Sequence, residues 1–442
     1  MHGSSEVASV GTMWLAAILF VITYAAIMSE KINRAIVSLL AAGLMILLGI
    51  LNQEAAIRGI DFNTIGLLIG MMVIVAITRQ SGVFQFMAIW SAKKVNANPW
   101  GILVMISLVT AVTSALLDNV TTVLLVVPVT LLITEELKVK PYPYLFAMIF
   151  ASNIGGTATL IGDPPNIMIG SATGLTFNDF AYNLTPVVLV IMAVTLIPIY
   201  FIWGRHLRAA PEDRQRVMQF NEYEAISDVR LLKHCLIVIG LVIGGFVFAK
   251  LLHLEAATVA MTGAALLLLL ANFGHDPEHQ SKHVLDAFNE VEWITIFFFV
   301  GLFIVVHGVD GTGLLKLLAE KMMALTGGNL TATTMVILWS SAILSAIIDN
   351  IPFVATMIPM IKAMAPTFGG SEGLMPLWWA LSLGACLGGN GTLIGASANL
   401  VVAGFAERAG QPIRFVQYTL MAFPLMLLSI AISAVYLYWR YL

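Results

Sequence analysis

The chain has 442 residues, of which 59% are hydrophobic and only 11% are charged, and its mean hydropathy is +0.92. Because soluble domains carry roughly 25% charged residues, this composition excludes a soluble globular protein and indicates a multi-pass membrane protein. The net charge of −3 gives no sign of nucleic-acid binding, and the two cysteines support neither a disulfide framework nor a metal site.

Ten apolar stretches are long enough to cross about 30 Å of hydrocarbon. In chain order, the crossings are predicted at 12–29, 35–51, 62–79, 144–175, 185–203, 235–252, 256–272, 292–309, 376–406 and 417–439. The crossings at 144–175 and 376–406 are overlong and rich in glycine at their centres. We therefore expect both of them to be helices that break midway.

Two further apolar segments, 100–134 and 331–362, carry Asp-Asn near the middle. This pair of polar residues divides each segment into arms of roughly 15 residues, which is short for a full crossing. Arms of that length favour two re-entrant hairpins, whose tips reach into the membrane.

The motifs of the first half recur in the second half. Ser114-Ala-Leu-Leu-Asp118-Asn119 returns as Ser345-Ala-Ile-Ile-Asp349-Asn350, at an offset of 231 residues. With five crossings in each half, the two copies enter the membrane from opposite faces. The fold class predicted is therefore an all-α polytopic membrane protein, built as an inverted repeat of residues 1–203 and 235–442 joined by a linker at 204–234. Paired polar breaks in the two halves of a membrane protein indicate a transported-substrate site.

The basic residues predict the orientation. When the 204–234 linker is placed in the cytoplasm, 16 of the 22 Lys and Arg residues, Arg34 among them, fall on the cytoplasmic side. That distribution agrees with the positive-inside rule. The expected location is the inner (plasma) membrane, with both termini outside.

Asp118 and Asp349 are the strongest candidates for function, because a carboxylate at membrane depth marks an ion, proton or substrate path by default. The alternative is that each aspartate only caps the second arm of its hairpin. Asp163 is a third such acid, and it aligns with Ala396 of the second half. Three acids in one site require protons or a cation to balance their charge, although Asp163 can also be an ordinary cap of the helix that resumes at Pro164.

The remaining candidate ligands are amide and hydroxyl side chains at the hairpin tips and helix breaks, whose alternative role is to satisfy unpaired backbone groups. The candidate substrate or ion site is Asp118, Asn119, Thr121, Asn153, Thr157, Thr159, Asp163, Asn166, Asp349, Asn350, Asn390, Thr392, Ser397 and Asn399. No catalytic residue, metal ligand or cofactor is expected.

These motifs resemble those of the ion transporter superfamily, which includes ArsB-type arsenite permeases, and especially the branch that contains the melanosomal P protein. The strings that carry the resemblance are Leu117-Asp118-Asn119-Val120-Thr121-Thr122, Ile161-Gly162-Asp163-Pro164-Pro165-Asn166, Ile348-Asp349-Asn350-Ile351-Pro352-Phe353 and Gly388-Gly389-Asn390-Gly391-Thr392. The resemblance implies scaffold helices at 12–51 and 235–272. It also implies a transport domain that carries the hairpins and broken helices, moves like an elevator, and belongs to a homodimer.

The resemblance further implies proton-coupled efflux of arsenite or antimonite. The alternative is a Na⁺/H⁺ antiporter, or another small-ion or anion carrier of the superfamily. An aspartate at each hairpin tip, where dicarboxylate carriers have Ser-Asn-Thr, opposes a bare dianion. A cage of three thiolates for As(III) is excluded, since only Cys386 lies near a motif.

The sequence gives less support to three other functions. A channel fits the paired hairpins less well than alternating access does. An intramembrane aspartyl protease typically shows Gly-x-Gly-Asp, whereas this chain has Leu160-Ile161-Gly162-Asp163. No enzyme activity is therefore expected. The chain has no Gly-x-x-x-x-Gly-Lys-[Ser/Thr] loop for ATP hydrolysis, and whether a cytoplasmic ATPase docks on it is left open.

Overall fold

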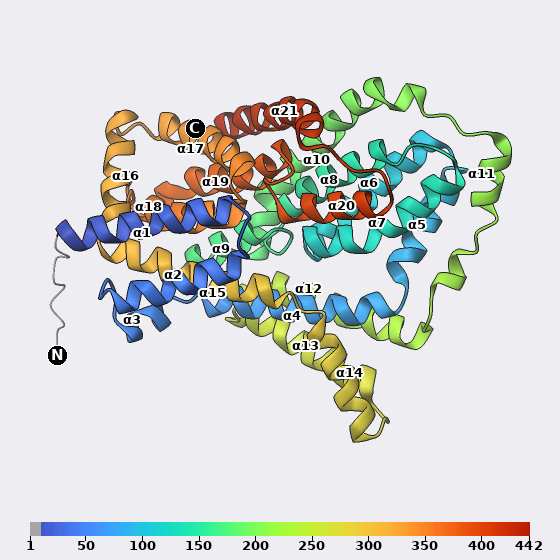
Figure 1. Ribbon diagram of the computed structural model, residues 1–442, viewed down its shortest axis with the longest axis horizontal. Helices are drawn as coiled ribbons and strands as arrows, with labels where there is room; N and C mark the ends of the chain where they lie inside the picture. The colour runs from blue at the N-terminus through green and yellow to red at the C-terminus, as the bar shows by residue number, and fades with distance from the viewer. Residues whose placement is uncertain (1–9) are drawn as a thin grey trace.

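The computed structural model describes residues 10–442, so the first nine residues of the predicted 1–203 repeat lie outside the described part. All regular structure in the described range is helical (Figure 1). Nine of its helices are long and apolar enough to cross a membrane. They are α1 (Val10–Met28), α4 (Phe62–Gln80), α6 (Pro99–Leu116), α7 (Asn119–Glu136), α10 (Phe177–Ile202), α12 (Val229–Leu252), α15 (Trp293–Gly311), α17 (Leu330–Ile347) and α21 (Phe415–Tyr441).

The other helices are shorter. They are α2 (Arg34–Leu47), α3 (Gln53–Arg58), α5 (Val83–Lys94), α8 (Tyr142–Thr157), α9 (Pro164–Thr173), α11 (Pro211–Met218), α13 (Ala256–Asn272), α14 (Pro277–Asn289), α16 (Leu314–Leu325), α18 (Asn350–Lys362), α19 (Met375–Gly388) and α20 (Ser397–Arg408), with 3₁₀ turns that include η4 (Gly389–Gly391). Four of them, α3, α5, α14 and α16, lie outside every predicted segment.

Three of the four hairpin arms are longer than the roughly 15 residues that the sequence predicted, and the fourth is shorter. In the first hairpin, α6 and α7 have 18 residues each, and in the second, α17 has 18 and α18 has 13. Helix α7 of the first hairpin continues past the apolar run to Glu136, and Lys138 just beyond its end takes a left-handed backbone conformation. Arm length therefore does not separate a re-entrant hairpin from a pair of crossings, and the re-entrant geometry stays a prediction.

The crossing predicted at 35–51 is also corrected. Its helix, α2, has only 14 residues and therefore spans about 21 Å. It ends early because Gly49 adopts a left-handed conformation with φ of +71°, which an α-helix cannot continue through.

The helices expected to break do so at their glycine-rich centres. The first ends as α8 at Thr157 and resumes as α9 at Pro164. The second ends as α19 at Gly388, makes the η4 turn, and resumes as α20 at Ser397. Proline at the first turn of α9 is well placed, because its missing N–H has no partner at a helix start.

Corresponding helices of the two halves make corresponding contacts. In the hairpin regions α6 packs on α8 and α17 packs on α19, and elsewhere α4 packs on α13 and α2 packs on α15. Figure 1 shows α6 and α7 toward one end of the molecule and α17 and α18 toward the other. The tips of the two hairpins therefore approach each other near the middle of the fold, where the broken helices are interrupted.

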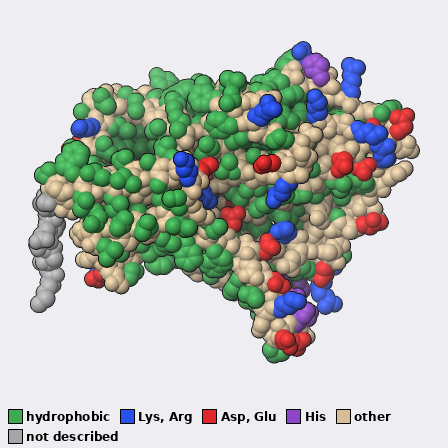
Figure 2. Space-filling view, viewed as in Figure 1, with side chains coloured by type: hydrophobic (Ala, Val, Ile, Leu, Met, Phe, Trp, Pro, Cys, Tyr) green, Lys and Arg blue, Asp and Glu red, His purple; other side chains and the backbone are tan. Residues whose placement is uncertain are grey.

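The linker between the halves is partly folded against the first half. It contains α11, and Arg216 and Lys138 form ion pairs with Glu136 and Asp213, respectively. Lys93 of α5 pairs with Glu222, so the 204–234 segment is more than a solvated connection. Figure 2 shows charged side chains gathered at the α11 end and over α14, whereas hydrophobic side chains cover most of the remaining face.

Candidate functional site

Six helices begin at one small cavity in the middle of the molecule. The cavity has a volume of about 30 Å³ and is lined from the first residues or caps of α2, α7, α9, α15, α18 and α20. Its polar lining residues are Arg34, Asp118, Asn119, Asp163, Glu292, Thr295, Asn350 and Ser397. Because a helix N-terminus carries a partial positive charge, the backbone makes this cavity electropositive before any side chain is counted.

Asp118 and Asp349 both cap the helix that follows them, as the alternative reading of the sequence proposed. The backbone N–H of Thr121 donates to Asp118 Oδ1 at 2.7 Å, and that of Ile351 donates to Asp349 Oδ1 at 3.1 Å. These bonds satisfy N–H groups that would otherwise lack partners at the start of α7 and α18. In each carboxylate the second oxygen remains free of this capping bond.

The environments of the two tip aspartates differ. Asp349 Oδ2 accepts a hydrogen bond of 2.8 Å from Arg34 Nη1, and this contact is an ion pair. For Asp118, no cation pairs with the carboxylate among residues 10–442. A cavity of about 290 Å³ beside the central one has Arg34, Asp349 and Ser397 in its lining, so the second tip also borders a larger cavity.

Asp163 is fully buried and lacks a cap bond from its side chain. Asn350 Nδ2 donates to its Oδ1 at 3.3 Å, while Oδ2 has no hydrogen-bond donor within the described part of the chain. A buried polar atom without a partner is rare and costly. The ordinary-cap reading of Asp163 therefore does not account for Oδ2, which is positioned to hold a proton or to contact a bound solute.

Four asparagines link the two halves beside this cavity. Asn119 Nδ2 donates to Asn153 Oδ1 at 3.2 Å, and Asn153 Nδ2 donates to Asn390 Oδ1 at 3.0 Å and Asn399 Oδ1 at 2.9 Å. All four side chains are buried. A buried amide network of this kind fixes the relative position of the hairpin tip and both helix breaks.

The other predicted ligands satisfy backbone groups at the breaks. Asn166 Nδ2 donates to the carbonyls of Thr157 and Thr159, and Asn399 Nδ2 makes the matching bonds to Gly389 and Thr392. The hydroxyls of Thr157, Thr159 and Thr392 likewise donate to carbonyl oxygens. Thr121 contributes its backbone N–H to the Asp118 cap. The structure therefore places these side chains behind the cavity lining, where they hold its shape.

Sequence reasoning missed Arg34, Glu292 and Thr295 as site residues. Arg34 was assigned to the cytoplasmic basic residues, but its guanidinium reaches Asp349, Ser397 and Thr295, with hydrogen bonds of 3.0 Å to the two hydroxyls. Glu292 and Thr295 repeat Asp61 and Thr64 of the first half at the same offset of 231 residues. A signal was present, since Arg34 and Glu292 are charges directly at the start of apolar helices.

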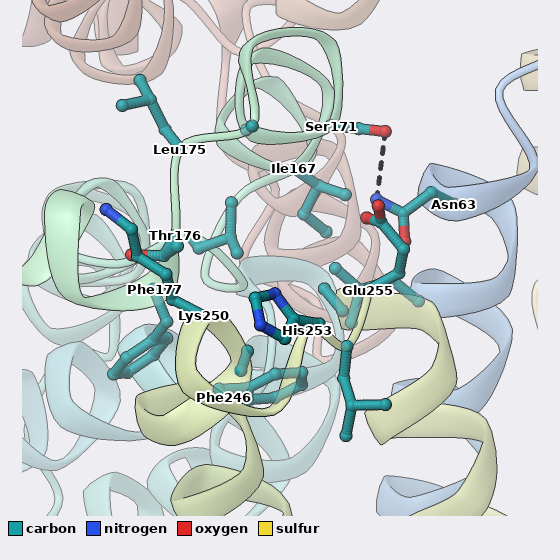
Figure 3. Close-up of a pocket in the computed structure, with 17 residues that line it drawn as sticks. Asn63, Ile167, Ser171, Leu175, Thr176, Phe177, Phe246, Lys250, His253 and Glu255 are labelled. Carbon is teal, nitrogen blue, oxygen red and sulfur yellow. Dashed lines mark hydrogen bonds between the residues drawn. The ribbon is translucent and has the colours of Figure 1, made fainter.

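A larger cavity lies elsewhere and contains none of the predicted site residues. It has a volume of about 380 Å³, and its lining includes Asn63, Ser171, Lys250, His253 and Glu255. Figure 3 shows the His253 ring inside this cavity and the bond from Asn63 to Ser171, of 3.1 Å. Glu255, the acid that lines this larger cavity, lies on an exposed loop and not at a helix break. The central cavity is therefore the better candidate for the functional site.

Comparisons with known proteins give a consistent result. A family model described as "Citrate transporter" (CitMHS) matches residues 24–384. An uncharacterized transporter of Mycobacterium tuberculosis is 42% identical over 431 residues, which cover 97% of this chain and 98% of that protein. The 46 kDa membrane protein of Mycobacterium leprae is 41% identical, with 97% and 99% covered.

The human P protein is 31% identical over 519 residues, which cover 99% of this chain and 60% of the P protein. This similarity confirms the resemblance carried by the hairpin and helix-break motifs. Among solved structures, the YdaH transporter of Alcanivorax borkumensis aligns with a TM-score of 0.54 and 15% identity, covering 97% of this chain and 99% of the other. At that identity the match concerns the fold alone.

Proposed function

Since the chain belongs to the citrate transporter family, and is thus a multi-pass membrane transporter, we propose that it is a secondary active transporter that exchanges protons for a small solute at the central cavity. The observation that supports this proposal is Asp163, which lines the cavity with Asp118 and whose buried Oδ2 has no donor among residues 10–442. A carboxylate in that position alternates between a protonated state and a state that contacts a solute. Such alternation is what coupling requires.

The leading substrate is arsenite or antimonite, exported in the uncharged hydroxide form. Asn119, Asn350 and Ser397 offer donors and acceptors for hydroxyl groups, and the carboxylates repel a bare dianion. The central cavity is small, which suits a compact solute. Release is favoured by oxygen and nitrogen ligands, because soft As(III) binds thiolates much more firmly.

Two alternative substrates are each supported by a specific observation. A Na⁺/H⁺ antiporter is favoured by the four acids that immediately precede helices at the cavity, Asp118, Asp163, Glu292 and Asp349, because carboxylate oxygens are ligands of hard cations. A carboxylate such as citrate is favoured by the family description and by Arg34, which recognises carboxylates bidentately.

We further propose the arrangement in the membrane that the sequence predicted. The repeats 1–203 and 235–442 are inverted relative to each other, and both termini face outward from the inner membrane. The hairpins and broken helices move against scaffold helices, through which two copies associate. If a cytoplasmic ATPase docks on this chain, we propose that it does so at the charged end around α11, which Figure 2 shows.

The test is proton flux in proteoliposomes that contain the purified full-length chain, with arsenite, Na⁺ and citrate supplied in separate experiments. Flux that requires arsenite supports the leading proposal. Flux with Na⁺ alone, or with citrate alone, replaces it by the corresponding alternative. Liposomes that carry the Asp163→Asn variant are the control for leakage, and flux unchanged in that variant would overturn the role assigned to the carboxylate.

A further inference from the structure

Arg34 joins a short helix of one part of the fold to the tip of the second hairpin. It is the first residue of α2, and its partner Asp349 caps α18, 315 residues away. The guanidinium also donates to Thr295 of α15 and Ser397 of α20, and it lies 5.0 Å from the centre of the Phe298 ring. Four helices therefore meet at one cationic side chain.

The position of this arginine is unfavourable without its partner. A cation at a helix N-terminus opposes the partial positive charge of the helix end. The side chains of Arg34 and Asp349 retain only 24% and 16% of their exposure, so breaking the pair leaves a poorly solvated charge on each side. Arg34 is therefore held by Asp349, and Asp349 by Arg34.

Arg34 shares the lining of two adjoining cavities with several acids. The charged residues that line the central cavity or its neighbour within residues 10–442 are Glu30, Arg34, Asp118, Asp163, Glu292 and Asp349. Arg34 is the one cation in this set. A solute cation or a proton that enters must therefore compete with Arg34 for Asp349.

The first hairpin lacks an equivalent cation. The counterpart of α2 in the second half is α13, because α13 follows α12 as α2 follows α1. Helix α13 carries no charged residue and so has no equivalent of Arg34. Asp118 accordingly has no ion-pair partner within the described residues. The two hairpin tips, which share the Asp-Asn motif, thus differ in whether an internal cation holds them.

We propose that Arg34 is a resident cation of the substrate-free site, which latches the tip of the second hairpin to α2 and α15 through Asp349. Binding of a proton or cation at Asp349 releases the latch and frees the tip to move. The released guanidinium then becomes a donor toward the solute in the cavity. Only this last step rests on the proposed transport function.

The experiment is hydrogen exchange by mass spectrometry on the detergent-solubilised full chain, without added solute. Peptides that cover residues 342–352 report on the tip. Arg34→Gln should raise their exchange about tenfold at neutral pH, the change expected when one hydrogen bond between charged groups is lost. Arg34→Lys, which keeps a cation, should restore most of the protection, and Asp349→Asn should match Arg34→Gln.

The controls separate a latch from a general loss of structure. Arg79→Gln removes an arginine whose ion pair with Glu290 is exposed, and it should leave the tip unchanged. The double variant Arg34→Gln, Asp349→Asn should show no more exchange than either single variant. Wild-type exchange at the tip of a folded Arg34→Gln protein, or additive effects in the double variant, would overturn the proposal. Because no solute is present, either result is independent of whether the transport proposal succeeds.

Discussion

Carboxylates of one chemical type serve different purposes at the centre of this protein because their partners differ. Asp118 and Asp349 each accept a hydrogen bond from a backbone N–H, and Asp349 accepts another from the guanidinium of Arg34. Asp163 accepts a hydrogen bond from the side-chain amide of Asn350 through Oδ1, while its Oδ2 has no donor in the described chain. Of the three carboxylates, Asp163 therefore contributes the least stabilisation to the folded protein through its charge.

Asp163→Asn should therefore abolish proton-coupled flux without lowering stability. The asparagine keeps the volume of the side chain and removes the cost of a buried acid that is incompletely paired. The midpoint of thermal unfolding in detergent should stay within a few degrees of wild type or rise, as should the yield of folded protein. A large loss of stability with intact flux would contradict this assignment.

Asp118→Asn and Asp349→Asn should each abolish coupled transport while the chain still folds. Asparagine caps helices about as well as aspartate, so the capping bonds at Thr121 and Ile351 survive the substitution. The measurement is proteoliposome flux alongside thermal unfolding. Asp228→Asn provides a matched control, because Asp228 caps α12 with two backbone bonds far from the cavity. Normal flux in both tip variants would remove the tip acids from the mechanism.

Hairpin and broken helix pack closely through glycine, in the same way in both halves. A Cβ on Gly155 of α8 would lie 2.2 Å from the carbonyl oxygen of Ala111, and one on Gly388 of α19 would lie 2.5 Å from that of Ala342. These contacts are to backbone, which cannot rotate away. The serine hydroxyls of Ser114 and Ser345 donate across the same interfaces at 2.6 Å.

Gly155→Ala and Gly388→Ala should each destabilise the protein by about 1–3 kcal/mol or more, as overpacking typically does. Gly43→Ala is the matched control, since Gly43 also lies within a helix but has no atom within 4 Å of its added Cβ. That substitution should be neutral or stabilising by up to about 1 kcal/mol. Thermal unfolding in one detergent compares all three. Equal effects at the three sites would disprove the close packing.

Local sequence predicted the elements that local chemistry determines. The Gly155-Gly156 and Pro164-Pro165 pairs predicted the first helix break because they change the backbone where they stand. The end of the first hairpin was placed too early because an apolar run does not show where a helix stops. Arg34 could not be recognised as a partner of Asp349, because a contact across 315 residues depends on the whole fold.

At the scale of the whole molecule, the distribution of charge predicts which surfaces face the cytoplasm. A cysteine introduced at exposed Glu278 of α14 should react with a membrane-impermeant maleimide only after the cells are opened. A cysteine at exposed Lys321 of α16 should react in intact cells. Both native cysteines are buried and can be left in place. Labelling of both sites from the same side would contradict the inverted arrangement.

Placing acids as helix caps has a consequence for how such a fold diversifies. Serine, asparagine and aspartate all start a helix well, so each capping position around the cavity accepts a neutral or a charged residue with little change in architecture. A single substitution at Asp118, Asp163 or Asp349 would thus alter the charge of the cavity by one unit while the helices begin where they did. Lineages built on this scaffold can change which solutes they accept without first evolving a new framework.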